Sequence, residues 1–231
     1  MTNSQVNKIK IIIATRLSRE DFFEKTATGR SLNIYKFPFL EICLFPENKD
    51  GLPKVYNSVI EKSLNDPCFM VFAHDDLHIL DFFWINKIIE GLNKFQIIGL
   101  VGNRRRLPRQ KSWLTVDGSS YDAPENLSGI IGHGNSFPPE NMNYYGPSGQ
   151  QVKLLDGLLF GVSSKTFVEN NIRFDERFDF HFYDLDFCRQ AEEIGLTCGT
   201  IPVSLIHESL GSFLSESWRN SYSKYLEKWG E

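Results

Sequence analysis

The 231-residue sequence predicts an α/β protein with a mostly parallel central sheet. In the first hundred residues, short apolar runs alternate with segments whose apolar residues recur at helical spacing. Such alternation is typical of parallel strands joined by helices that cover the faces of the sheet. Hydrophobic residues make up 41% of the chain and charged residues 23%, which provides a sizeable core and excludes global disorder.

The expected elements follow one another in a regular order. Short runs that are apolar almost throughout predict buried strands at residues 9–14, 39–45, 68–73 and 97–101. Helical periodicity predicts helices at residues 18–26, 52–64 and 81–92, with Ser18 as an N-cap of the first. Right-handed crossovers between these strands give a half of the nucleotide-binding type.

The composition changes after Gly102. Residues 103–149 are rich in Gly, Pro, Asn and Ser and show little periodicity, so we expect a long loop that is functional or mobile. Order returns at residues 152–162, followed by expected helices at 164–170, 184–194 and 215–229 and a strand at 197–201. Because the second half has no full alternation of its own, we expect one two-lobed domain.

Composition and charge also exclude several classes of protein. The net charge of −4 disfavours a globally basic nucleic-acid-binding protein. No apolar stretch approaches the ~20 residues that cross a bilayer, and the polar first residues do not resemble a secretion signal. The cysteines are scattered without a CxxC pair, which favours reduced thiols in a cytoplasmic protein over disulfides or a zinc site. They are Cys43, Cys68, Cys188 and Cys198.

The first candidate for chemistry is His74-Asp75-Asp76, directly after the third expected strand. In open α/β sheets, ligands bind at the carboxyl ends of the strands. Two carboxylates and an imidazole at that edge can hold a divalent cation whose shell is completed by phosphate oxygens. The alternative is a polar turn in which one of the aspartates caps the next helix.

Two further candidates lie in the second half. An acidic and aromatic run at residues 174–189 leads into an expected helix, and Asp184 lies at its start. The helix dipole there favours the ionised carboxylate, which suits a general base, although a simple N-cap is the alternative. His207 follows a strand in a Gly- and Ser-rich segment, where a lone histidine is more often structural.

Taken together, these motifs resemble the GT-A glycosyltransferases, and more narrowly the small bacterial glycosyltransferase-like domains of family two. The resemblance extends from about residue 9 to 212 and rests on the order of the motifs: His74-Asp75-Asp76, Asp156-Gly157, the helix start at 183–188 and the late segment 206–212. It implies a GT-A type fold, with a Rossmann-like, mostly parallel sheet flanked by helices and a smaller acceptor-side sub-region. A single domain over residues 1–231 would then comprise a nucleotide-binding half (1–102), an acceptor and catalytic half (103–214) and a C-terminal helix (215–231).

The resemblance also implies roles for individual residues. Asp76 matches the direct metal ligand, His74 stands in place of the first acid of the metal motif, and His207 matches a late histidine that completes the metal shell. Asp184 matches the general base, and Tyr183 replaces the glutamate that precedes it in the family. The remaining matches are Thr15, Arg16, Glu47, Asn57 and Asp75 at the nucleotide, and Asp156, Gly157 and Tyr183 at the sugar substrates.

The implied function is that of an inverting, hexosyltransferase-like enzyme. It would move a sugar from a nucleotide-diphosphate donor to a hydroxyl of a carbohydrate or lipid-linked glycan, assisted by Mn²⁺ or Mg²⁺, in bacterial glycan and polysaccharide assembly. We expect a cytoplasmic protein with no nucleic-acid partner, no transmembrane segment and membrane contact only at its periphery. The alternatives are a catalytically silent nucleotide- or sugar-binding module and a metal-dependent phosphohydrolase, for which the sequence offers no plausible two-metal ligand set.

Two features of the second half leave alternatives open. The basic run 104–111 is either an anion site for phosphates or a solvated loop. The aromatic residues of the 103–149 loop either form a flap that binds the acceptor or pack the loop onto the core. The aromatic stripe of residues 218–229 is expected to pack against the domain or a partner subunit, because it lacks the basic face of an interfacial helix.

Overall fold

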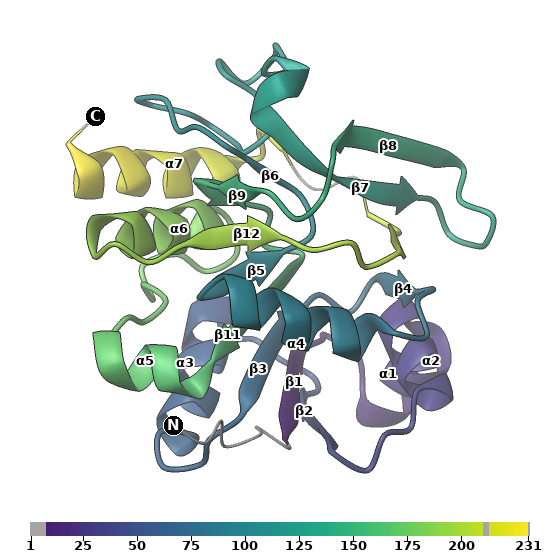
Figure 1. Ribbon diagram of the computed structural model, residues 1–231. Coiled ribbons are helices and arrows are strands. Elements are labelled where there is room, and N and C mark those ends of the chain that lie inside the picture. Colours follow the sequence, from purple (N-terminus) through teal and green to yellow (C-terminus); the bar gives the residue numbers. More distant parts are fainter. Residues whose placement is uncertain (1–7, 210–212, 231) are drawn as a thin grey trace.

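The molecule is built around a seven-stranded sheet ordered β2-β1-β3-β11-β5-β12-β9, shown in the computed structural model of Figure 1, which describes residues 8–209 and 213–230. Five strands share one direction, whereas β11 and β9 run antiparallel to their neighbours. The predicted mostly parallel α/β fold is therefore confirmed. The parallel strands are β1 (Ile9–Ala14), β2 (Leu40–Phe45), β3 (Phe69–Ala73), β5 (Ile97–Gly99) and β12 (Cys198–Thr200), and the other two are β9 (Gln151–Val152) and β11 (Leu159–Ser163).

The helices cover this sheet with their apolar stripes. In the longest ones of the first half, the buried side chains recur every three or four residues, as the sequence pattern predicts. They are α3 (Leu52–Lys62) and α4 (Trp84–Lys94), followed in the second half by α5 (Ser164–Asn170) and α6 (Tyr183–Glu193). None of the helices in the described ranges is both long and apolar enough to cross a membrane.

The helix predicted at residues 18–26 is confirmed as α1 (Arg19–Lys25). A second helix that the sequence did not predict, α2 (Ala27–Ile34), follows directly. Thr26 ends the first helix and caps the second, because its hydroxyl accepts a hydrogen bond from the Gly29 N–H at 2.9 Å. Thr28 of α2 then donates to the carbonyl of His74 at 2.8 Å, so this helix braces the segment that follows β3.

A second sheet, ordered β10-β6-β7-β13-β4 with β8 paired to β7, forms the other lobe. It contains a long hairpin where the sequence analysis expected a loop without regular structure, and that expectation is wrong. The hairpin is glycine-rich and has a bulge between Gly129 and Ile130, so the alternation that marks a strand is interrupted. The strands are β4 (Leu77–Ile79), β6 (Gly102–Asn103), β7 (Leu127–His133), β8 (Asn141–Gly146), β10 (Leu154–Leu155) and β13 (Leu205–His207), with a short 3₁₀ helix at Pro124–Asn126.

The C-terminal helix α7 (Glu216–Trp229) packs against the domain, as expected. Trp218 and Tyr225 are buried against the ring of Phe182, just before α6. Lys228 forms an ion pair at 2.7 Å with Asp186, which is fully buried. The division of the chain at residues 102 and 214 stays a prediction, and residues 210–212 of the late sequence motif lie outside the described residues.

Candidate active site

A cavity of about 600 Å³ opens at the carboxyl ends of the central strands. Its wall is formed by the ends of β1 and β3, the turn between β10 and β11, the start of α6 and the ends of β7 and β13. This is the edge at which open α/β sheets bind ligands. Eight of the predicted site residues line it: His74, Asp75, Asp76, Asp156, Gly157, Tyr183, Asp184 and His207.

Three of these residues form a cluster that could hold a metal ion. One ligand atom each from His74, Asp76 and His207 lies within 4.8 Å of the other two. The second sheet makes this possible, because β13 pairs with β4 so that His207 is opposite Leu77. The Glu208 N–H donates to the carbonyl of Asp76 at 3.0 Å, which fixes the two segments side by side.

The atoms of this cluster fit a divalent cation. Asp76 Oδ1 and His207 Nε2 are buried and make no hydrogen bond, although His207 Nε2 is only 3.2 Å from Asp76 Oδ2. Buried polar atoms without partners are costly, and a cation between them would satisfy both. Burial of the His207 imidazole lowers its pKa, but the neighbouring Asp76 carboxylate outweighs this and raises the pKa of His207 above its ordinary value. A cation bound here would replace the proton of His207, because a histidine must be neutral to bind a metal.

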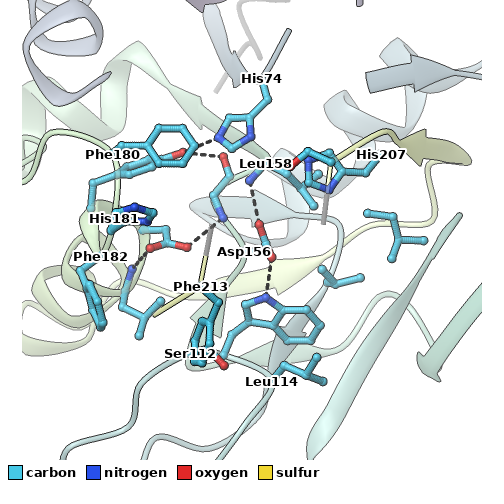
Figure 2. A pocket seen from close by; sticks show the side chains of 18 of the residues that line it. His74, Ser112, Leu114, Asp156, Leu158, Phe180, His181, Phe182, His207 and Phe213 are labelled. Atoms are coloured by element: carbon cyan, nitrogen blue, oxygen red, sulfur yellow. Dashed lines mark hydrogen bonds between the residues drawn. The ribbon is translucent and has the colours of Figure 1, made fainter. Parts of the chain in front are cut away.

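The ring of His74 is held from two sides. Phe180 stacks on it with ring centroids 5.5 Å apart, and the hydroxyl of Tyr183 lies 3.2 Å from its Nε2 (Figure 2). The same hydroxyl donates to the carbonyl of Gly157 at 2.7 Å. Burial, together with the charge of His207, lowers the pKa of His74, so its imidazole is kept neutral, as a metal ligand must be.

Asp184 lies in the first turn of α6 and faces the cavity. Its carboxylate accepts hydrogen bonds from the backbone N–H groups of Gly157 at 3.1 Å and Leu185 at 2.9 Å. Burial and the negative charge of Asp156 nevertheless raise the pKa of Asp184 to about 7. The expectation that the helix dipole would favour the ionised form is therefore wrong, because desolvation and a like charge outweigh it.

Asp156 is fixed by two donors. The indole N–H of Trp113 donates to its Oδ2 at 2.5 Å, and the backbone N–H of Leu158 donates to Oδ1 at 3.0 Å (Figure 2). Trp113 is buried and meets the ring of Tyr145 edge-on at 5.0 Å. Its aromatic ring thus packs the loop onto the core, while its polar edge reaches the site.

The loop that carries Trp113 is anchored by Asp122, a buried residue that sequence reasoning missed. Its carboxylate accepts hydrogen bonds from Asn103 and Arg105, which hold the pKa of Asp122 well below its usual range although burial opposes this. Arg106 is likewise paired with Glu192 at 3.0 Å. Two arginines of the basic run thus neutralise the protein's own carboxylates, which disfavours the anion-site alternative.

Four predicted nucleotide-binding residues are not among the residues that line the cavity. Arg16 and Glu47 are exposed on the loops that follow β1 and β2, whereas Thr15 is buried. Asn57 is turned elsewhere, because its amide pairs with the backbone of Phe174 on both sides, at 2.8 and 3.1 Å. That Asn57 faces the nucleotide stays a prediction, which these two hydrogen bonds disfavour.

His133 belongs to the aromatic residues of the 103–149 loop, and nothing in the sequence placed it beside the metal cluster. It lies at the end of β7, directly opposite His207 at the end of β13, with ring centroids 6.0 Å apart. Its Nδ1 is buried without a hydrogen-bond partner, and burial lowers the pKa of this imidazole. Gly132 and Gly134 interrupt the pattern of strand-forming residues at the end of β7. The sequence therefore did not indicate that His133 and His207 lie side by side.

Comparisons with known proteins agree with this picture. The sequence model of the Glycosyltransferase like family matches residues 20–228. The solved structure of the mannosyltransferase PcManGT from Pyrobaculum calidifontis, in complex with GDP-Man and Mn²⁺, superposes with a TM-score of 0.51 at 12% identity, covering 92% of this chain and 59% of that one. The structure of S. aureus TarS 1–349 gives 0.47 at 13% identity, covering 87% and 60%.

The chain thus spans about three-fifths of the length of each of these structures. At 12% identity, the likeness to the mannosyltransferase shows the fold alone. None of the curated protein sequences matches this chain.

Proposed function

The chain belongs to the glycosyltransferase-like family, and from this premise we propose that it transfers a sugar from a nucleoside-diphosphate donor to a hydroxyl acceptor, with inversion at the anomeric carbon. One observation carries the proposal. A single cavity joins a cluster suited to a divalent cation with a carboxylate, Asp184, whose pKa is raised to about 7. These are the two chemical functions that transfer from a nucleotide sugar requires.

The metal cluster would serve the leaving group. When bound at His74, Asp76 and His207, Mn²⁺ or Mg²⁺ supplies Lewis-acid stabilisation of the charge that develops on the departing diphosphate. The mannosyltransferase structure contains both GDP-Man and Mn²⁺, which supports a nucleotide sugar and a divalent ion as ligands of this chain. Asp75 faces the same cavity and would contact the nucleotide.

Asp184 would act as the general base. Its carboxylate takes the proton of the acceptor hydroxyl while that oxygen forms a bond to the anomeric carbon and the bond to the diphosphate breaks on the opposite face. Proton removal by a positioned base contributes about 10²–10⁴ in rate, and a pKa near the working pH is optimal for it. Asp156, Gly157 and Tyr183 surround this carboxylate and would contact the two sugars.

The nucleoside would extend from the cavity toward Thr15, Arg16 and Glu47, on the loops after the first two parallel strands. We propose a carbohydrate or lipid-linked glycan as acceptor and bacterial glycan assembly in the cytoplasm as the setting. Three buried thiols without disulfides suit a reducing compartment.

A thermal-shift screen of UDP, GDP, CDP and dTDP, each with and without MnCl₂, tests the proposal. A ligand at 100 times its Kd stabilises the folded chain by about 2.7 kcal/mol, which raises the melting temperature by several degrees. We expect one nucleotide to give such a shift in the presence of Mn²⁺ only. Asp76→Asn should abolish it, and Asp50→Asn, in an exposed ion pair with Lys54, should leave it unchanged.

A folded sample that responds to none of the four nucleotides would contradict the proposal. A shift followed by no turnover of the corresponding sugar donor would instead indicate a silent binding module. Rapid release of inorganic phosphate from phosphate esters, with no sugar transferred, would indicate a phosphohydrolase.

A further inference from the structure

Two residues that differ from the motifs of the resembled family touch each other. By that resemblance, His74 replaces the first acid of the metal motif and Tyr183 replaces the glutamate before the base. The two side chains are 109 positions apart in the sequence, yet the Tyr183 hydroxyl lies 3.2 Å from His74 Nε2. The two replacements therefore form one structural unit.

The hydrogen bonds of this unit determine which ring nitrogen of His74 carries the proton. A tyrosine hydroxyl has a single proton, and that of Tyr183 is donated to the carbonyl of Gly157 at 2.7 Å. Toward His74 the hydroxyl oxygen can then only accept, so Nε2 of the neutral imidazole must be the protonated nitrogen. The lone pair is consequently on Nδ1.

This lone pair is available to the cluster. Because Nε2 of His74 is 3.2 Å from the Tyr183 hydroxyl, Nδ1 is the ring nitrogen that is left for the cluster, and the centroid of the His207 ring is 6.1 Å from that of His74. Phe180 stacks on the ring and restricts its rotation. The site thus offers two imidazole nitrogens and one carboxylate, whereas an acid in place of His74 would leave one imidazole and two carboxylates.

We propose that His74 and Tyr183 together make the site select first-row transition ions over Mg²⁺. Tyr183 is the positioning residue, because it fixes the tautomer of His74. The inference rests on the proposed function in one respect: it takes the cluster of His74, Asp76 and His207 as the site of the divalent ion. Imidazole ligands favour transition ions, whereas Mg²⁺ prefers oxygen ligands. Affinity should therefore fall in the order Co²⁺, Mn²⁺, Mg²⁺.

Calorimetric titration of the untagged chain with CoCl₂, MnCl₂ and MgCl₂ tests the selectivity. We expect Mn²⁺ to bind at least tenfold more tightly than Mg²⁺, and Co²⁺ more tightly still, with absorption bands that report nitrogen ligands. His74→Asp should weaken Co²⁺ binding and strengthen Mg²⁺ binding. His78→Gln is the matched control, because His78 is bonded to Glu208 at 2.7 Å and stands outside the cluster.

Tyr183→Phe tests the positioning role. Loss of such an outer partner costs about 10–100-fold in metal affinity, so we expect at least a tenfold loss for Co²⁺ with an unchanged circular dichroism spectrum. In the His74→Asp background the same change should have no further effect, because no imidazole remains to be oriented. An equal loss in both backgrounds would assign Tyr183 a merely structural role and overturn this part of the inference.

Equal affinity for Mg²⁺ and Mn²⁺, or cobalt bands that His74→Asp does not alter, would overturn the selectivity. These outcomes are separate from failure of the proposed function, since the nucleotide screen reads donor binding directly. A nucleotide that binds without any preference among the three ions would reject this inference and leave the transferase proposal intact.

Discussion

The carboxylate of Asp184 accepts a hydrogen bond from the backbone N–H of Gly157 at 3.1 Å, and the residue that precedes this glycine is Asp156. Two carboxylates thus flank one short turn. Burial and the charge of Asp156 together raise the pKa of Asp184 to about 7. A carboxylate that would be a weak base in water is therefore poised to exchange a proton near neutral pH.

The rate of sugar transfer should follow the ionisation of Asp184. A base must be ionised to accept a proton, so single-turnover release of nucleoside diphosphate should rise with pH and level off above about pH 7. Asp156→Asn removes the neighbouring charge and should move the inflection to lower pH, whatever it does to the maximal rate. A profile that is flat from pH 5.5 to 8.5 would exclude Asp184 as the group that titrates.

The free energy of unfolding should also depend on the ionisation of Asp184. It should fall with rising pH, whereas the rate of sugar transfer should rise. Because the pKa of Asp184 is raised on folding from 3.8 to about 7, the fold favours the protonated form, and stability is lost as pH rises from about 4 to 7. Asp184→Asn cannot ionise and escapes this loss. Relative to the unaltered chain, its free energy of unfolding should improve by roughly 3 kcal/mol between pH 5 and pH 8.

Urea unfolding at the two pH values measures this difference. Glu193→Gln, an exposed position on the same helix, is the control and should show no such change. The free energy of unfolding of Asp184→Asn, relative to the unaltered chain, could instead rise no more between pH 5 and pH 8 than that of this control. Ionisation of Asp184 would then cost the fold no stability, which contradicts the prediction.

Trp113 should act on catalysis through Asp156. Trp113→Phe keeps an aromatic ring beside Tyr145 but removes the 2.5 Å hydrogen bond to the carboxylate. A hydrogen bond to a charged group contributes about 1.5–3 kcal/mol, so kcat/KM should fall at least tenfold. Trp84→Phe is the matched control, because that residue is buried at least as deeply, its indole N–H makes no hydrogen bond and it lies in α4. Comparable losses in both variants would mean that only packing matters.

The ion pair between Lys228 and Asp186 should anchor the C-terminal helix. Asp186 is fully buried, so Lys228→Met leaves its charge uncompensated and should lower the free energy of unfolding by about 3–5 kcal/mol. Adding Asp186→Asn removes the stranded charge and should recover part of that loss. A double variant whose loss equals the sum of the single losses would show that the two residues are not coupled.

Much of the fold could be predicted from the sequence, because its longer elements are locally consistent. The run at residues 9–14 is apolar enough to be a buried strand in any context, and Ser18 and Ser215 cap helices at the expected positions. The strands β4 and β13 were not predicted. Each has only three residues, and it is their pairing rather than their composition that makes them strands.

The site was predictable only as separate motifs. Asp76, Asp184 and His207 all reach one cavity, as the order of the motifs implied. The proximity of His133 to His207 could not be anticipated, because it depends on a parallel pairing between distant strands. The pKa of Asp184 was misjudged for a similar reason, since the helix dipole is visible in the sequence whereas the neighbouring Asp156 is not.

The most direct test of the account compares the unaltered chain with Asp184→Asn on the sugar donor that matches the nucleotide found in the screen. Both should bind the nucleotide equally, with Mn²⁺ present. Release of nucleoside diphosphate by the variant should be slower by about 10²–10⁴, and the product of the unaltered chain should have the inverted anomeric configuration by NMR. A variant that retains activity within a few-fold, or a product with retained configuration, would contradict the assignment of Asp184 as the base of an inverting transfer.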